Sequence, residues 1–169
     1  MKKWNLLLFV VMVLPLVSFS PPKGPKLLKK LERYCQAVTS EFDQIPEERK
    51  ENLKELGDFI YQKRANNEAV KLTVICTHNS RRSHIGQMWL HAAAIWYGID
   101  EITAFSGGTE ATAFNPRAVA ALNRAGFRIN KVKSAENPTY KGTFLKGSGR
   151  SGMIMFSKKF SDSQNPAEN

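Results

Sequence analysis

The sequence is poor in cysteine, and this shortage excludes several kinds of site. Among 169 residues only Cys35 and Cys76 are cysteines, too few for a disulfide framework and without the paired spacing of a zinc knuckle. The histidines His78, His84 and His91 also lack a paired ligand spacing on one helical face, so no metal site is predicted. At least one of the two cysteines is therefore a candidate for a reactive thiol.

Acidic residues are the second shortage. Asp and Glu number 15 against 25 Lys and Arg, which gives a formal net charge of +10 and favours anionic partners. The basic residues are spread along the chain, and no helix-turn-helix, zinc-finger or aromatic RNA-binding motif accompanies them, so no nucleic-acid partner is predicted. With 42% hydrophobic and 24% charged residues, the composition suits one compact globular domain.

Long hydrophobic runs are lacking too, apart from one near the N-terminus. Lysines precede an apolar run from Leu6 to Phe19, the pattern of a secretory signal peptide, and roughly 14 residues are few for a membrane span. Pro21 and Pro22 disfavour cleavage, so an uncleaved anchor and a buried N-terminal element stay as alternatives. We expect residues 1–20 to be a signal peptide or membrane anchor, the protein to be exported (periplasmic or secreted) or anchored, and membrane association to run through residues 4–19.

Residues 21–70 are expected to form an N-terminal helical segment. Apolar residues at helical spacing predict amphipathic helices over 25–39 and 46–66. Pro46 with the glutamates that follow it gives the second helix a favourable first turn. Cys35 lies on the apolar side of the first helix and is interpreted as a packing residue.

From residue 71 the chain alternates strand and helix. The predicted elements, in order, are a strand over 71–76, a helix from 83 to the residues before Gly98, a strand over 102–106, and a helix that begins at Asn115-Pro116 and ends at Gly126. This order predicts a parallel sheet with right-handed crossovers, and so an α/β fold.

The C-terminal part has a different character. Thr143 to Leu145 and Met153 to Phe156 flank a glycine-rich stretch, which predicts a β-hairpin. That stretch matches Gly-x-Gly-x-x-Gly, but a strand follows it instead of a helix, so we predict no dinucleotide cofactor. The tail over 161–169 is polar and contains no predicted closing element.

The loop of residues 76–83, Cys-Thr-His-Asn-Ser-Arg-Arg-Ser, lies between the first of these strands and its helix. Consecutive backbone N–H groups in a tight loop form a concave nest, and the N-terminus of the helix adds roughly half a positive charge. The guanidinium of Arg82 completes a cradle for an oxyanion. The predicted oxyanion- or phosphate-binding residues are Thr77, His78, Asn79, Ser80, Arg81, Arg82 and Ser83.

Cys76 stands at the floor of this cradle. The positive field that binds an anion also stabilises a thiolate, so we expect a lowered pKa and a nucleophilic thiol at neutral pH. Ser83 can donate a hydrogen bond to that thiolate. A thiolate there can attack a bound phosphorus in line while the loop and Arg82 hold the charge on the equatorial oxygens. Cys76 and Arg82 are therefore the predicted catalytic residues.

Cys-x5-Arg-Ser between a strand and a helix resembles the phosphate-binding loop of the low-molecular-weight protein tyrosine phosphatase family, which also includes the thioredoxin-coupled arsenate reductases. The resemblance covers about residues 71–132 and extends to the Ser-Gly-Gly-Thr-Glu sequence at 106–110. It implies a three-layer αβα fold with a parallel sheet, and a covalent phosphocysteine or thiol-arsenate adduct on Cys76. It also implies that the strained loop is supported by Asn79, Ser83 and Ser106.

The sequence departs from the family pattern in its catalytic partners. It contains no Asp-Pro pair to supply the family's general acid, and Asp162 is the only aspartate after Asp100. It has no cysteine after the loop for an arsenate reductase relay, and Arg81 replaces the second loop cysteine. The phosphatase-like domain of residues 71–169 is therefore interpreted as C-terminally incomplete.

These departures leave three functions open. The first is hydrolysis of a phosphate monoester, with phosphotyrosine as the expected substrate, through a cysteinyl-phosphate intermediate. The second is an arsenate reductase relative, which lacks its resolving cysteines and whose partner is a thioredoxin-type reductant. The third is a catalytically impaired domain that binds an oxyanion or a phosphorylated protein.

Overall fold

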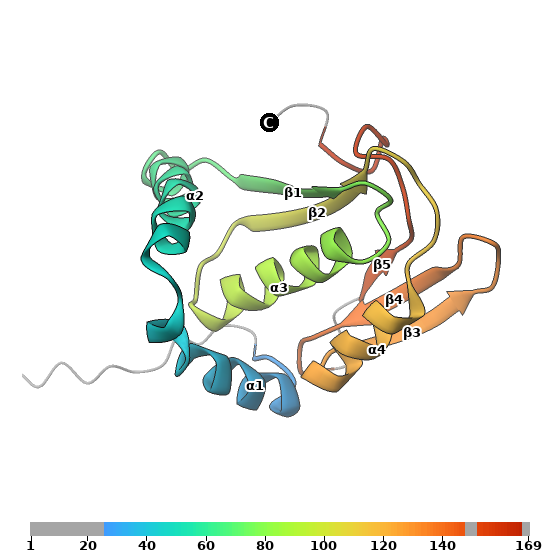
Figure 1. The fold of residues 1–169 in the computed structure, drawn as a ribbon, viewed down its shortest axis with the longest axis horizontal. Helices are drawn as coiled ribbons and strands as arrows, with labels where there is room; N and C mark the ends of the chain where they lie inside the picture. The colour runs from blue at the N-terminus through green and yellow to red at the C-terminus, as the bar shows by residue number, and fades with distance from the viewer. Residues whose placement is uncertain (1–25, 148–151, 167–169) are drawn as a thin grey trace, which may run out of the picture.

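The computed structural model describes residues 26–147 and 152–166 and has the α/β architecture that the sequence predicts at the coarse level (Figure 1). The helices are α1 (Lys29–Thr39), α2 (Glu47–Ala65), α3 (Arg82–Trp96) and α4 (Pro116–Ala125), with a 3-10 helix at Phe42–Gln44. The strands are β1 (Val70–Cys76), β2 (Ile102–Gly108), β3 (Arg128–Lys133), β4 (Thr139–Thr143) and β5 (Met153–Met155).

The predicted signal peptide or anchor at residues 1–20, including the stretch at 4–19, lies outside the described residues. Within residues 26–147 and 152–166, no helix is both long enough and apolar enough to cross a membrane. Export and anchoring therefore stay predictions.

The strands β1 and β2 form the predicted parallel pair, with α3 as the crossover between them. Their register runs from Val70 opposite Ile102 to Cys76 opposite Gly108, so both strands end at the same edge. Figure 1 shows α3 along one face of the pair, with α1 and α4 on the other side of α3. The carboxyl edge of this parallel pair is the place where the loop after Cys76 begins.

The ends of α4 follow from its sequence. The side chain of Asn115 accepts a hydrogen bond from the N–H of Arg117, and Pro116 occupies the first turn, where it needs no backbone partner. Gly126 ends the helix with φ 116°, a left-handed conformation that favours glycine. A side chain at position 126 would also clash, because its Cβ would lie 2.5 Å from the backbone nitrogen of Leu31. The predicted bounds of this helix are confirmed.

The second sheet is antiparallel, in the order β3-β4-β5. The sequence predicts a β-hairpin here, but its first strand is Thr139–Thr143 and not Thr143 to Leu145. Tyr140 of this strand is buried in the core, whereas Leu145 forms an isolated bridge to Leu27. The strand β3 was not predicted at all. Only Ile129 of its six residues is buried, so its sequence carries little of the alternation by which strands are recognised.

The hydrophobic core lies mainly on the side of α3 away from β1 and β2. It joins α1, α3, α4 and the antiparallel sheet, and its fully buried members include Leu31, Met88, Phe114, Leu122 and Met155. Cys35 belongs to this cluster with 4% of its surface exposed, which confirms its prediction as a packing residue.

The helix α2 forms where it was predicted, but its expected apolar face is not buried. None of its residues is buried, and Leu53, Leu56 and Phe59 are each about two-fifths exposed. The helical spacing correctly predicts the helix, and it does not predict what the helix packs against.

The C-terminal tail also differs from the prediction, because it closes against β2. Lys159 forms a parallel bridge with Gly108, and the Asn165 side chain, which is 6% exposed, donates to the carbonyl of Ser106 at 3.3 Å. The sequence predicts no closing element in this polar tail, but the buried Asn165 amide anchors it to β2.

Candidate active site

The loop from Cys76 to Ser83 joins β1 to α3 and borders a small cavity. The cavity has a volume of about 230 Å³ and is lined by Cys76, His78, Ser80, Arg81, Arg82, Thr112 and Asn115. Both predicted catalytic residues, Cys76 and Arg82, therefore meet at one cavity. A volume of this size suits a small tetrahedral oxyanion.

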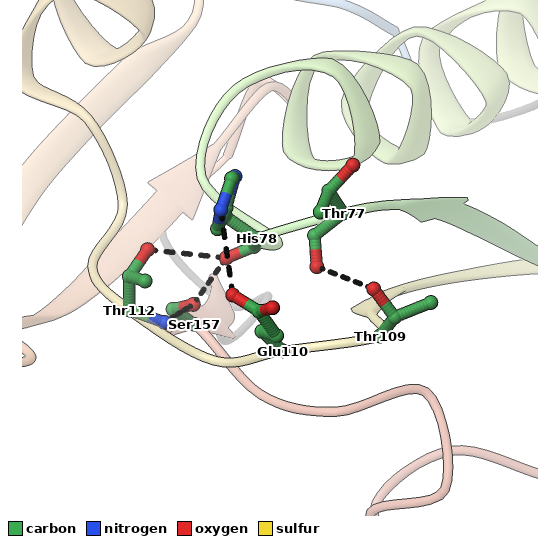
Figure 2. A network of polar contacts seen from close by, with 6 residues as sticks. All are labelled: Thr77, His78, Thr109, Glu110, Thr112 and Ser157. Carbon is green, nitrogen blue, oxygen red and sulfur yellow. Dashed lines mark hydrogen bonds and ion pairs between the residues drawn. The ribbon is translucent and has the colours of Figure 1, made fainter.

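Three of the predicted loop residues do not line the cavity. Asn79 and Ser83 are fully buried, and they support the loop from behind. The carbonyl of Thr77 accepts a hydrogen bond from the N–H of Glu110 at 2.8 Å. The same carbonyl accepts a hydrogen bond from the hydroxyl of Thr109 at 3.2 Å (Figure 2). These bonds tie the loop to the residues that follow β2.

Glycine at position 108 allows that close approach. A Cβ on Gly108 would lie 2.5 Å from the backbone nitrogen of Asn79 and 2.6 Å from the carbonyl oxygen of Thr77. Both are backbone atoms that cannot move aside without displacing the loop. The end of β2 and the loop thus fit together only because residue 108 has no side chain.

The thiol of Cys76 is surrounded by hydrogen-bond donors. Its Sγ lies 3.1 Å from the hydroxyl of Ser83. Burial raises the pKa of the thiol, but hydrogen bonds from the Ser83 hydroxyl and from the backbone of Ser83, Ser80 and Asn79 outweigh burial and lower the pKa to about 7. A substantial fraction of Cys76 is therefore thiolate at neutral pH, the state that acts as a nucleophile.

Asn79 links the loop to the C-terminal part of the chain. Its backbone adopts φ 43°, a left-handed conformation that Asn tolerates better than most residues. Its side-chain amide donates to the Ser83 hydroxyl at 2.8 Å, and its side-chain oxygen accepts the N–H of Lys158 at 2.8 Å. Asn79 thereby fixes the hydroxyl that contacts Cys76.

Ser106 reaches the loop less directly than its predicted role suggests. Its hydroxyl lies 3.3 Å from Nδ1 of His84, a fully buried ring that stacks on Phe114 with centroids 4.0 Å apart. Burial, followed by the nearby Lys158, lowers the pKa of His84 to about 3, so the ring is neutral. Sequence reasoning considered His84 only as a metal ligand and missed this packing role.

The residues before α4 form the opposite wall of the cavity. The hydroxyl of Ser80 donates to the carbonyl of Ala113 at 2.6 Å, and the N–H of Asn115 donates to the carbonyl of Ser80 at 2.9 Å. Sequence reasoning used Asn115 only to place the start of a helix, and it did not identify Thr112. Nothing local in the sequence indicates that this segment returns to the loop.

Positive charge dominates the cavity. Arg81 and Arg82 lie at the beginning of α3, whose first turn has no acidic residue, so the guanidiniums and the helix N-terminus favour an anion together. The imidazole Nε2 of His78 lies 3.4 Å from the carboxylate of Glu110 (Figure 2). Asp162 is not at this cavity, since it lines another one with Thr73 and Ile75 and other residues of the tail.

No metal centre emerges among residues 26–147 and 152–166, where no three His, Cys, Asp or Glu side chains gather to hold an ion. Comparison with protein-family models, with curated proteins and with solved structures finds no match for this chain. The resemblance to the low-molecular-weight phosphatases therefore stays a prediction that rests on the residues of the loop.

Proposed function

We propose that this chain hydrolyses phosphate monoesters through a covalent intermediate on Cys76. The observation that carries the proposal is the contact of 3.1 Å between Cys76 Sγ and Ser83 Oγ at the floor of a cavity that also presents Arg81 and Arg82. A thiolate, an anion cradle and a small polar cavity are the parts that phosphoryl transfer to cysteine needs.

The reaction has two steps. The Cys76 thiolate attacks the bound phosphorus, a sulfur–phosphorus bond forms, and the ester oxygen leaves with its electron pair and takes up a proton from water. Water then attacks the phosphorus, the sulfur–phosphorus bond breaks, and inorganic phosphate and the thiolate are released. In both steps the loop N–H groups and the Arg82 guanidinium stabilise charge on the three equatorial oxygens.

The finer fold and the substrate belong to the same proposal. We infer a three-layer αβα arrangement of the phosphatase type, supported by the parallel β1–β2 pair and its α3 crossover. Phosphotyrosine is the proposed physiological ester, on the strength of the loop sequence Cys-x5-Arg-Ser alone.

Arsenate reduction is the second candidate, because arsenate has the shape and charge of phosphate and fits the same cavity. That reaction needs a further thiol to resolve the arsenic adduct and a thioredoxin-type reductant to restore it. The other cysteine of this sequence, Cys35, is 4% exposed within the hydrophobic core. It cannot reach an adduct on Cys76 without unpacking α1, and this favours phosphate ester hydrolysis by the present chain.

The experiment is the release of para-nitrophenol from para-nitrophenyl phosphate, whose leaving group needs little help from an acid. We expect Cys76→Ser to reduce the rate by on the order of 10³-fold or more, because a serine hydroxyl is a far weaker nucleophile here. Cys35→Ala is the matched control and should keep the rate of the wild type. Equal release by the wild type and Cys76→Ser would refute the proposal.

A domain that binds without turnover gives a different result in the same samples. Phosphate would then protect Cys76 from alkylation in the wild type, while the release of para-nitrophenol would not exceed that of Cys76→Ser. This pair of measurements separates an enzyme from a phosphate-binding domain.

A further inference from the structure

The segment of residues 157–159 lies directly behind the anion-binding loop, although about 80 residues separate the two in sequence. The backbone carbonyl of Lys158 accepts a hydrogen bond from the N–H of Gly108 at 3.0 Å, and the N–H of Phe160 donates to the carbonyl of Gly108 at 2.9 Å. These bonds continue the edge of β2. They also bring Ser157 and Lys158 against His78 and Asn79.

The first of two routes to Cys76 runs through a backbone peptide. The hydroxyl of Ser157 donates to the carbonyl of His78 at 2.9 Å, and the hydroxyl of Thr112 donates to the same oxygen at 3.2 Å (Figure 2). That carbonyl and the N–H of Asn79 belong to one peptide unit. The backbone of Asn79 is among the groups that lower the pKa of the Cys76 thiol.

A donor on the carbonyl side of a peptide acts on its N–H side in two ways. It fixes the plane of the peptide, and it polarises the unit so that the N–H becomes a stronger donor. Both effects strengthen the hydrogen bond that Asn79 gives to a thiolate at Cys76. The effect on neutral thiol is smaller, because a neutral sulfur accepts hydrogen bonds weakly.

The second route runs through side chains. The N–H of Lys158 donates to the side-chain oxygen of Asn79 at 2.8 Å, and the Asn79 amide donates to the Ser83 hydroxyl at 2.8 Å. When Cys76 is a thiolate it can only accept, so the Ser83 hydroxyl is then the donor in its contact with Sγ, 3.1 Å away. Two neighbouring residues of the C-terminal part therefore act on the same sulfur.

Ser157 is itself held from every side. The Asn137 side chain accepts the N–H of Ser157 at 3.1 Å and donates to its carbonyl at 2.7 Å. The N–H of Thr112 donates to the Ser157 hydroxyl at 2.9 Å, which leaves the hydroxyl hydrogen free for His78. Ser157 is 1% exposed, so these bonds and the surrounding packing hold its side chain in place.

We propose that Ser157 is a positioning residue for the nucleophile, which aims the His78–Asn79 peptide at Cys76 and so favours the thiolate. The role deepens the function proposed above and rests on it. Ser157 is not among the residues that line the cavity. It acts on Cys76 only through the loop backbone.

Charged and titratable groups also surround the thiol, and the substitution leaves all of them in place. Arg81, Arg82 and His78 line the cavity with Cys76, and Glu110 faces His78. Behind the loop lie His84 and Lys158, whose pKa values are both lowered, mainly by burial. A change in the Cys76 titration after replacement of Ser157 therefore reports the lost hydroxyl.

The test measures the alkylation rate of Cys76 by iodoacetamide between pH 5 and 9 in the full chain, with peptide mapping to separate it from Cys35. We expect Ser157→Ala to slow alkylation at pH 6 by roughly threefold and to move the midpoint of the profile to higher pH, because the thiolate loses support. Thr112→Val should cause a smaller change in the same direction. Ser161→Ala, at an exposed position two residues beyond the segment, should cause none.

Each outcome decides between the two claims. Wild-type Cys76 with a high midpoint and slow alkylation like that of Cys35 would contradict the proposed function itself. An acidic wild-type profile that Ser157→Ala leaves unchanged would overturn only the role of Ser157. Continued protection of buried Cys35 reports that a variant is folded. If Ser157→Ala fails this check, Ser157→Cys replaces it, because a thiol keeps the shape of the side chain but donates weakly. An unchanged Cys76 profile in that variant overturns the role.

Discussion

The two cysteines of this chain lie in regions that shift the pKa of a thiol in opposite directions. At Cys35 in α1, burial in the hydrophobic core, together with the nearby Glu32 carboxylate, raises the pKa of the thiol. At Cys76, after β1, burial also raises the pKa, but four hydrogen bonds outweigh it and the pKa falls to about 7. Burial alone therefore does not decide whether a cysteine is inert.

The two regions differ in whether the backbone N–H groups near the cysteine already have a hydrogen-bond partner. In α1 the backbone N–H groups beside Cys35 are used within the helix, so none is left for sulfur. In the loop, the N–H groups of Asn79, Ser80 and Ser83 precede or begin a helix and have no carbonyl partner four residues earlier. A reactive thiol requires such free donors, and the end of a parallel strand before a helix supplies them.

The largest expected effect comes from replacing Arg82, which lines the cavity beside Cys76. Arg82→Gln should lower kcat/KM for para-nitrophenyl phosphate by about 10²–10³-fold, because in the proposed mechanism Arg82 is the bidentate donor to the phosphoryl group. Arg82→Lys keeps the charge and should recover only part of the loss, since an ammonium lacks the planar fork. Steady-state kinetics of both variants, with Arg33→Gln in α1 as a control away from the cavity, would check this. Wild-type kinetics in Arg82→Gln would contradict it.

The second prediction concerns the packing behind the loop. The pKa of His84 is lowered to about 3, so the folded protein does not protonate this ring until the pH is low, whereas the unfolded chain protonates it near its ordinary pKa of 6.5. The free energy of unfolding should therefore fall as the pH falls from about 6.5 toward 3. His91 contributes in the same direction, because burial lowers its pKa as well.

Urea unfolding at a series of pH values tests this account. His84→Gln should be less stable overall but should lose stability less steeply between pH 6.5 and 4 than the wild type. The steepness is the informative quantity, because a purely steric effect of the substitution would shift the curve and leave its slope alone. Identical slopes in the two proteins would show that His84 is not buried as a neutral ring.

The smallest expected effect is the change in the free energy of unfolding when sulfur is replaced by oxygen at each cysteine. Cys35→Ser places a hydroxyl in the core and should lower the free energy of unfolding by about 1–2 kcal/mol. Cys76→Ser places the hydroxyl among existing donors and should change stability by less than about 1 kcal/mol while it abolishes turnover. Unfolding in urea measures both variants. A larger loss for Cys76→Ser than for Cys35→Ser would reverse the comparison.

The local parts of this fold could be predicted because their causes are local. The strand before Cys76, the loop, the cap at Asn115 and the left-handed Gly126 all follow from residues within a few positions of one another. The burial of Cys35 follows from helical spacing in the same way. Each of these features depends on periodicity or on the conformational preference of single residues.

Long-range features could not be predicted, because no nearby residue indicates them. Ser157 gives no local sign that it reaches His78, and Asn165 gives none that it is buried beneath β2. The helix α2 has helical spacing, but the described parts of the chain bury none of its residues. The candidate nucleophile was therefore visible in the sequence, while the groups that hold it in place required the structure.

The central claim is that the Cys76 region, unlike the Cys35 region, holds a thiolate in an anion-binding cavity. The most direct test compares the alkylation rates of the two cysteines across pH 5 to 9, with and without inorganic phosphate. The account predicts that Cys76 titrates with a midpoint near pH 7 and is protected by phosphate, while Cys35 stays slow throughout and indifferent to phosphate. Slow alkylation of both cysteines, with no effect of phosphate on Cys76, would contradict it.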